Sequence, residues 1–518
     1  MAEIVIIRKN SYFDSVTLMT LSNKLKKVDG VSDAVVSMAT DMNKDLLDGI
    51  GMSSAEVVSA GPNDLLIAIR AANQEICDST LVLMDELLNE KKGGNKKGAQ
   101  TVFHTISEAK RNEEALNFAI ISVKGEFAAR EAREAIKNDM HVMLFSDNVT
   151  IEQELEIKMQ AHEKGLLVMG PDCGTAIIDG VGLCFANKVR SGKIGLVAAS
   201  GTGLQELTVL VDRLGEGVSQ AIGTGGRDLS ATIGGIMMLD GLKLLENDEA
   251  TELICLVSKP PVKEVADKIL QQVGLCKKPV VVCFISGTPE LLAGTKAVFA
   301  ANLEDAAVKC VQTLRGVQTS PACGTIFKGN EAWLAENACK LKPEQKYIRG
   351  LYCGGTLTSE TATEMERALS NVFSNVSKKA EHKMKDPMVS CFHSVVDLGD
   401  DTFTVGRPHP MIEPGLRNER FLTEMADPET AVVVMDFELG YGSHEDPVGV
   451  SIEVIREAKA KNAKVGREVP IIAYVQGTEE DFQGYASQKQ ALEAEGVYVT
   501  SSNLQAALAA ISLVKDRG

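Results

Sequence analysis

Two short turns hold residues of the types that bind anions. They contain Ser200, Gly201, Thr202 and Gly203 in one part of the chain, and Gly354, Gly355 and Thr356 in another. Each turn stands between an apolar run and a stretch with helical periodicity, so each is predicted to open a helix. A helix begins with unpaired N–H groups and the positive end of its dipole, and glycines leave the backbone uncovered. The chemistry predicted here is the binding of a phosphate or carboxylate.

Two other glycine-containing loops carry further candidates. The loop GPDCG holds Asp172, whose carboxyl either accepts hydrogen bonds from a substrate or caps the loop. The loop GTGGRD holds Gly225, Gly226 and Arg227. The guanidinium of Arg227 suits bidentate capture of a carboxylate or phosphate, although an exposed ion pair with Asp228 explains it equally well.

A rigid RPHP loop supplies the last candidate, His409. Its imidazole could act as a general acid or donate a hydrogen bond to the substrate; the alternative is a solvated loop histidine. Cys173 has no base beside it in the sequence, so we interpret it as a residue needed for the shape of its loop. Arg227 and His409 are therefore the two catalytic candidates.

Composition narrows the classes of partner. The formal net charge of −17 argues against nucleic acid and anionic membranes, but a local site can still hold a small anion. The 11 cysteines include no CxxC pair, which favours a reduced, cytoplasmic protein without a disulfide framework or structural zinc, and no metal site is predicted. No signal peptide opens the chain, and no apolar run approaches the ~20 residues of a membrane span.

The pattern of apolar runs predicts an α/β protein of several domains. Strands alternate with helices over most of the chain, which is typical of parallel sheets with helices on their faces. The predicted segments are a small ferredoxin-like α/β domain (1–90), a charged linker (91–100), a Rossmann-like domain (101–190), a third domain (191–316), a bridge (317–346) and a last domain (347–518).

The third and last domains are predicted to be copies of one fold. KPVVVCFISGTPE at 278–290 corresponds to VPIIAYVQGTEED at 469–481, and TELICLVSKPP at 251–261 corresponds to TAVVVMDFELG at 430–440. Two copies in one chain commonly pack about a pseudo-two-fold axis. We therefore expect the two anion-binding helix starts to face one shared site.

These residues resemble the succinyl-CoA synthetase superfamily over roughly 101–518. GLLVMGPDCGTAII is similar to the loop that ends the CoA-binding domain of that family, and KIGLVAASGTGLQEL and AIGTGGRDLS are similar to the ligase domain of its alpha subunit. The resemblance implies a CoA-binding-type domain at 101–190 and two flavodoxin-like ligase domains at 191–316 and 347–518. The fused arrangement resembles the FdrA family of acyl-CoA-synthetase-like proteins, which implies carbamoyl transfer in the breakdown of nitrogen compounds.

The sequence departs from that superfamily in three ways. No histidine stands between His162 and His382, so the family's phosphohistidine has no counterpart in the loop after KPVVVCFISGT. No stretch remains for an ATP-grasp domain. The first glycine-rich turn of the CoA-binding domain is not visible near 101–113, which leaves CoA as a candidate cofactor only.

The residues and the resemblance together predict an enzyme subunit that transfers a carbamoyl or acyl group to or from phosphate. Carbamoyl phosphate, phosphate and acyl-CoA are the expected small anionic ligands, and a homo-oligomer or sibling subunits are the expected assembly. A CoA ligase that borrows an ATP-binding partner and a non-catalytic metabolite-binding scaffold remain alternatives. A nicotinamide-dependent dehydrogenase is weaker, because no GxGxxG follows a first strand with an acidic residue downstream.

Overall fold

The computed structural model describes residues 2–11, 13, 15–26, 28–40, 43–44, 47–48, 50–92, 102–317, 329–404, 407–515 and 517. The chain forms two compact units, one of residues 1–102 with 406–408 and one of residues 103–405 with 409–518. Most of the predicted linker and the first part of the predicted bridge lie outside the described residues.

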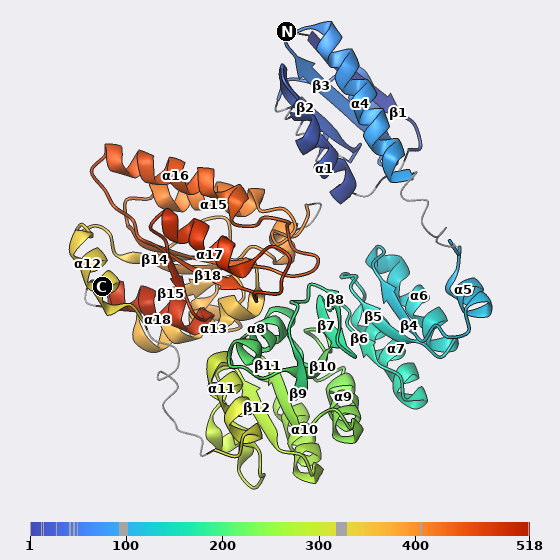
Figure 1. Cartoon of the computed structure of the whole chain (residues 1–518), viewed down its shortest axis with the longest axis vertical. Coiled ribbons are helices and arrows are strands. Elements are labelled where there is room, and N and C mark those ends of the chain that lie inside the picture. Colours follow the sequence, from blue (N-terminus) through green and yellow to red (C-terminus); the bar gives the residue numbers. More distant parts are fainter. Residues whose placement is uncertain are drawn as a thin grey trace. The chain divides into compact units, whose positions relative to one another are not determined.

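The N-terminal unit (blue in Figure 1) is a three-stranded antiparallel sheet with helices. Its elements are β1 (Ala2–Arg8), α1 (Ser15–Lys26), β2 (Val31–Met38), α3 (Ala55–Ser59), β3 (Leu65–Ala71) and α4 (Gln74–Lys92). The sheet order is β1-β3-β2, and β3 is the central strand. Apolar residues of α1 and α4 share a core with the sheet. Apart from the short α3, this is the predicted ferredoxin-like order without its last strand.

The larger unit opens with a small parallel sheet of order β4-β5-β6. Its elements are α5 (Ile106–Asn112), β4 (Phe118–Ile121), α6 (Gly125–Lys137), β5 (His141–Leu144), α7 (Ile151–Lys164) and β6 (Val168–Met169). The strands and helices alternate as predicted. The sheet ends at the loop that carries Asp172.

A seven-stranded sheet follows, with the order β13-β12-β11-β9-β10-β7-β8. Its elements are β7 (Thr175–Ile178), β8 (Val181–Cys184), β9 (Ser191–Ala198), α8 (Gly201–Arg213), β10 (Val218–Gly223), α9 (Ile236–Asn247), β11 (Leu253–Ser258), α10 (Lys263–Leu275), β12 (Val280–Phe284), the 3₁₀ helix η1 (Pro289–Leu292), β13 (Val298–Phe299) and α11 (Leu303–Leu314). The hairpin β7–β8 precedes the expected domain boundary at 190 but belongs to this sheet. Its strand β7 pairs with β10 in an antiparallel ladder, in which Ile177 lies opposite Ala221.

The last sheet has six parallel strands in the order β15-β16-β14-β17-β18-β19. Its elements are α12 (Glu331–Lys340), β14 (Tyr347–Tyr352), α13 (Gly355–Ala368), β15 (Val372–Ser374), η3 (Ala380–His382), β16 (His393–Asp397), α14 (Asp401–Thr404), α15 (Gly415–Ala426), β17 (Thr430–Glu438), α16 (Gly449–Lys464), β18 (Ile471–Gln476), α17 (Tyr485–Ala494), β19 (Tyr498–Thr500) and α18 (Asn503–Val514). The strands β9-β11-β12-β13 of the seven-stranded sheet correspond in order to β14-β17-β18-β19 of this sheet. The shared order supports the predicted duplication.

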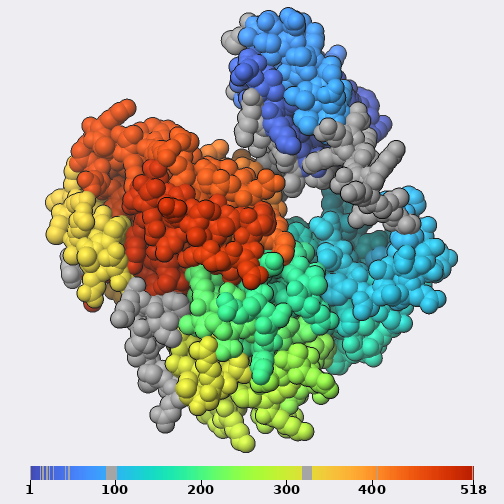
Figure 2. Space-filling view, viewed as in Figure 1, coloured from blue at the N-terminus to red at the C-terminus, as the bar shows by residue number. Residues whose placement is uncertain are grey.

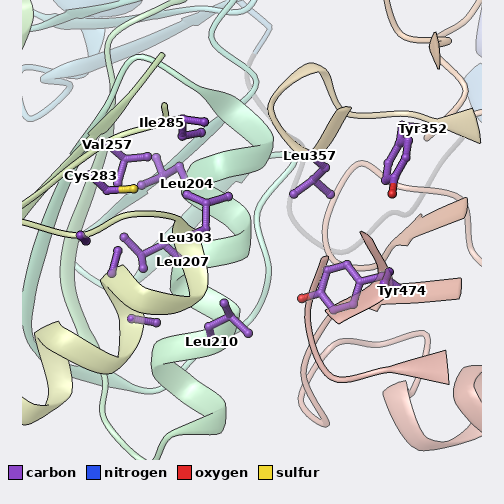
Figure 3. Close-up of a cluster of buried hydrophobic side chains, with 14 of the residues drawn as sticks. Leu204, Leu207, Leu210, Val257, Cys283, Ile285, Leu303, Tyr352, Leu357 and Tyr474 are labelled. Carbon is purple, nitrogen blue, oxygen red and sulfur yellow. The ribbon is translucent and has the colours of Figure 1, made fainter. Parts of the chain in front are cut away.

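The two copies share one apolar core. Leu204, Leu207 and Leu210 project from α8 among residues of the first copy, while Leu357 and Tyr474 lie across from them in the second copy (Figure 3). In the space-filling view the green and orange-red parts of this unit are in direct contact (Figure 2). Burial of this common core fixes α8 and α13 against each other, and with them the two predicted helix starts.

Candidate anion-binding site

The start of α8 is formed as the sequence predicts. The buried strand β9 ends at Ala198, and Ser200 is the N-cap residue of α8. The Ser200 hydroxyl oxygen accepts a hydrogen bond from Gly203 N at 3.0 Å. A serine cap of this kind satisfies one of the N–H groups left unpaired at a helix start.

The starts of α8 and α13 touch. The hydroxyl groups of Ser200 and Thr356 form a hydrogen bond across the two copies, and both residues are buried. A Cβ placed on Gly354 would lie 2.6 Å from Thr202 Cγ2, so the contact requires a glycine at this position. The structure thus brings together all seven residues of the two predicted turns.

The start of α13 differs because its N-cap residue, Gly354, has no side chain to accept a hydrogen bond. The first bond of this helix runs from Thr358 N to Gly354 O at 2.9 Å. Within the part of the chain that the structure describes, the N–H groups of Gly355, Thr356 and Leu357 meet no acceptor. These three donors form the open end of the site.

Two charged side chains lie at this open end, and sequence reasoning missed both. A Cβ placed on Gly355 would lie 2.6 Å from Asp397 Oδ2 and 3.9 Å from Lys259 Nζ. Burial raises the pKa of Asp397 to about 7, while the charge of Lys259 acts against that shift. Burial also lowers the pKa of Lys259. Lys259 follows β11 and Asp397 ends β16, so both stand at carboxyl ends of parallel strands, where ligands bind in open α/β sheets.

Two buried glutamates, one on α8 and one on α13, make nearly equivalent contacts with the opposite copy. Glu206 of α8 accepts from Asn503 N at 3.3 Å, and Glu360 of α13 accepts from Leu303 N at 2.9 Å. Each therefore binds the first residue of the last helix of the opposite copy. Burial raises the pKa of each carboxyl to about 7.

His409 lies next to this site. Its Nδ1 accepts from Met411 N at 3.3 Å, and its ring lies 5.8 Å from the ring of Phe185. A Cβ placed on Gly399 would lie 2.4 Å from His409 Nε2, so the histidine packs against the segment that follows Asp397. Burial lowers the pKa of His409 to about 4, and the imidazole is therefore neutral near pH 7.

Asp172 and Arg227 form a second group. Arg227 donates to Val149 O at 2.7 Å and pairs with Glu154 at 2.9 Å, and not with Asp228, which was the alternative to a role in binding. Desolvation, followed by the charges of Asp401 and Asp147, raises the pKa of Asp172 to about 6. The structure does not place Arg227 against the helix starts.

A buried ion-pair network explains why Asp228 is unavailable to Arg227. Lys158 Nζ lies 2.8 Å from both Asp228 Oδ1 and Glu154 Oε1, and the three side chains are fully buried. Asp228 also accepts from Met238 N at 2.9 Å, at the start of α9. Lys158 thereby fixes the loop between β10 and α9 onto α7.

The predicted glycines of that loop have different surroundings. A Cβ on Gly225 would lie 2.5 Å from Pro171 O, and the residue has a positive φ of 83°, so Gly225 is needed for packing against the Asp172 loop. A Cβ on Gly226 would meet no atom within 4 Å. Cys173 is buried, and desolvation raises the pKa of its thiol to about 12, which leaves no nucleophile there.

Another cluster, outside the predicted residues, has donors that could hold a metal. Cys353, Asp436 and Glu438 are buried, and their ligand atoms lie within 4.8 Å of one another. However, Arg417 Nη1 lies 3.4 Å from Cys353 Sγ and 4.0 Å from Asp436 Oδ1. A guanidinium already supplies positive charge at this place, so a metal ion fits the cluster poorly.

Comparison with known proteins identifies the family. The chain is similar to the uncharacterized protein YahF of Escherichia coli (strain K12), with 49% identity over 506 residues, which are 98% of this chain and 97% of YahF. The chain belongs to the YahF family. Family models match at 1–103 ("AllF, heavy metal-associated domain"), at 189–287 ("CoA binding domain") and at 351–513 ("CoA-ligase").

More distant relatives of this YahF-family chain are subunits of CoA ligases. Succinate–CoA ligase subunit alpha 2 of Archaeoglobus fulgidus is 29% identical over 196 residues, which are 37% of this chain and 66% of that protein. Malate–CoA ligase subunit alpha of Methylorubrum extorquens is 28% identical over 176 residues, which are 32% and 58% of the two chains. The solved structure of PH0766 from Pyrococcus horikoshii OT3 covers 81% of this chain and 88% of that one, at 15% identity and a TM-score of 0.34.

The family models and the curated relatives establish an acyl-CoA-synthetase-like chain with CoA-binding and CoA-ligase domains. The CoA-binding model matches 189–287, whereas the sequence resemblance implies that domain at 101–190. Among the described helices, none combines the length and apolar character needed to cross a membrane.

The name of the first family model raises the question of a heavy metal in the N-terminal unit. Residues 1–102 contain one cysteine, Cys77, and no histidine. The Cys77 thiol is buried in the core and donates to Ala2 O at 3.4 Å. Burial raises its pKa, which disfavours the thiolate form. The residues of this unit therefore do not fit a thiolate metal site.

Proposed function

We propose that this chain is an FdrA-type subunit of an enzyme that transfers a carbamoyl or acyl group to or from phosphate. The observation that carries the proposal is the contact between the starts of α8 and α13, with open N–H donors and a lysine at one of them. Such a place can bind the phosphate of carbamoyl phosphate.

The absence of a phosphohistidine favours a ready-activated substrate. The loop after β12, where the superfamily has this histidine, reads Ser286, Gly287 and Thr288. Ser286 instead hydrogen-bonds Thr363 of α13 at 2.9 Å. Carbamoyl phosphate already contains an activated phosphate, so its use needs neither the histidine nor ATP.

The transfer itself makes one bond and breaks one. A nucleophilic atom of the acceptor bonds to the carbonyl carbon of carbamoyl phosphate, and the bond from that carbon to the bridging phosphate oxygen breaks. Inorganic phosphate leaves with the electron pair, and the proton of the nucleophile passes to a base. Fixed N–H donors stabilise the leaving phosphate, and orientation at the helix starts lowers the barrier further.

The segment from Asp397 to Asp401 connects the two groups of candidate residues. Asp397 lies at the start of α13, whereas the charge of Asp401 acts on Asp172. In the proposal, His409 donates a hydrogen bond beside the helix starts, while Arg227 and Asp172 serve the acceptor end. The proposed acceptors are molecules from the breakdown of nitrogen compounds. The proposed assembly is a homo-oligomer or a complex with sibling subunits.

Calorimetric titration of the full chain with carbamoyl phosphate, phosphate, CoA and ATP as separate titrants tests the proposal. We expect carbamoyl phosphate and phosphate to bind, with affinity lost in a Gly355→Glu variant. Phosphate release upon addition of candidate acceptors and subunits then tests turnover. Failure of both phosphates to bind would overturn the proposed function.

A CoA ligase that works with an ATP-binding partner is the second candidate. The CoA-binding and CoA-ligase family models favour it. Binding of CoA without any response to carbamoyl phosphate would identify this function. Tight binding of an anion without turnover in any combination of subunits would indicate a metabolite-binding scaffold.

A further inference from the structure

The side chain of Lys259 is unusual in its position. It follows β11 of the first copy but reaches the start of α13 in the second copy, where its Nζ lies 3.9 Å from a Cβ placed on Gly355. Among the residues that the structure describes, Lys259 has no hydrogen-bond acceptor and no ion-pair partner for its ammonium group. The lysine is also partly buried, so water reaches it only in part.

The positive charge at the start of α13 is not fully compensated by negative groups of the protein. The positive end of the α13 dipole disfavours a cation beside it. The nearest acid is Asp397, and burial keeps that carboxyl partly neutral near pH 7 because its pKa is raised to about 7. A bound anion would pair with the ammonium and with the open N–H groups at once, and so would satisfy both sets of donors.

The start of α8 provides the contrast. There the Ser200 side chain caps Gly203 N, and the nearest side-chain atom to a Cβ on Gly201 is the Thr175 hydroxyl at 3.7 Å. The Thr175 hydroxyl is itself engaged, because it donates to Phe185 O at 2.8 Å. No ammonium or guanidinium group is found against the start of α8 among the described residues.

We propose that Lys259, together with the N–H groups of Gly355, Thr356 and Leu357, binds the phosphate of the substrate, and that α13 rather than α8 supplies the donors. This inference rests on the proposed function and assigns the phosphate to one side of the shared site. Lys259 stabilises negative charge on the phosphate as it leaves. When ionised, the carboxylate of Asp397 beside it can accept the proton that the acceptor's nucleophile releases.

Inorganic phosphate is the probe for the test, with the full chain in calorimetry at pH 7. We expect Lys259→Met to weaken phosphate binding by about ten- to a hundredfold, which is the range for loss of a charge-assisted hydrogen bond. Lys259→Arg should restore part of the affinity. Lys263→Met is the matched control, since Lys263 is exposed on α10 and pairs with Asp267. Melting temperatures establish that the variants fold.

A second readout reports on Lys259 in the unmodified protein. An amine-reactive reagent such as trinitrobenzenesulfonate should label Lys259 early because its pKa is lowered, and phosphate should protect it. Mass spectrometry measures the labelled fraction. If Lys259→Met bound phosphate as tightly as the wild type, and phosphate did not protect Lys259 from labelling, the role of Lys259 would be overturned. The proposed function would still stand. Absence of phosphate and carbamoyl phosphate binding to the wild type would overturn the proposed function as well.

Discussion

The starts of α8 and α13 are equivalent in the duplicated fold but differ in their chemistry. α8 begins behind a serine whose hydroxyl caps its own helix. α13 follows Gly354, which has no side chain to cap the helix, and the side chains of Lys259 and Asp397 lie near its first residue, Gly355. The α8 copy thus caps one N–H group of its helix start with its own serine, whereas the α13 copy has no side-chain cap.

The two copies share a buried glutamate one helical turn and more behind their helix starts. Glu206 and Glu360 occupy the same position of α8 and α13, six residues after the N-cap residue of each helix. Each binds the last helix of the opposite copy. The two helix starts therefore differ at their caps, while equivalent glutamates fix each helix to the opposite copy.

The largest effect is expected from Gly355→Glu. Its Cβ would stand 2.6 Å from Asp397 Oδ2, and its carboxylate would place a negative charge at the open donors. We expect loss of measurable phosphate binding in calorimetry. Gly274→Glu is the matched control, because Gly274 is exposed on α10 and a Cβ there would meet no atom within 4 Å. Equal loss in both variants would show that the effect is not local to α13.

The glutamate pair should make stability depend on pH. Each carboxyl has a pKa of about 7 in the folded protein against an ordinary value of about 4.5, so folding retains protons that the unfolded chain releases. Their contribution is full below about pH 4.5 and is lost as the pH rises to about 7, at up to about 1.4 kcal/mol per pH unit for each group.

Urea unfolding between pH 4.5 and 7.5 measures this contribution. In the double variant Glu206→Gln with Glu360→Gln, the free energy of unfolding should decline less steeply as the pH rises, because the amides do not titrate. Glu252→Gln serves as the control, because Glu252 lies exposed in a surface ion pair with Lys193. A constant difference between wild type and the double variant across this range would contradict the assignment.

Sequence patterns were sufficient for the scaffold and for the turns of the site. Apolar runs and local glycines specify β9, α8, β14 and α13, because these signals act over a few neighbouring residues. The duplication then predicted that the two starts would meet, and the Ser200–Thr356 contact fits that prediction.

Lys259 and Asp397 escaped prediction because their proximity is tertiary. One follows a strand of the first copy and the other ends a strand of the second, 138 positions apart in the sequence. Each stands in a polar loop sequence, SKPP or VDLGDD, that reads as an ordinary solvated connection. The rule that ligands bind at the carboxyl ends of parallel strands would have singled out both positions.

Asp397 should control the pH dependence of anion binding at α13. Its carboxyl is neutral below its pKa of about 7 and negative above it, so anion affinity should fall by about tenfold as the pH rises from 6 to 8. Sulfate is the suitable probe because it keeps its charge over this range. Asp397→Asn should remove the dependence, whereas His409→Gln should leave it in place, since the neutral His409 does not titrate there. A flat wild-type profile would exclude Asp397 from this role.

The smallest effect on binding is expected at the start of α8, which has its own serine cap. Ser200→Ala removes the cap of α8, which costs about 1 kcal/mol of stability and is measurable as a lower melting temperature. Phosphate affinity should change by less than about threefold, because the Ser200 oxygen already serves Gly203 N and Thr356. The matched comparison is Lys259→Met, which should weaken binding far more. If Ser200→Ala weakened phosphate binding as strongly as Lys259→Met, the two starts would contribute equally, and α13 would have no special part in holding the anion.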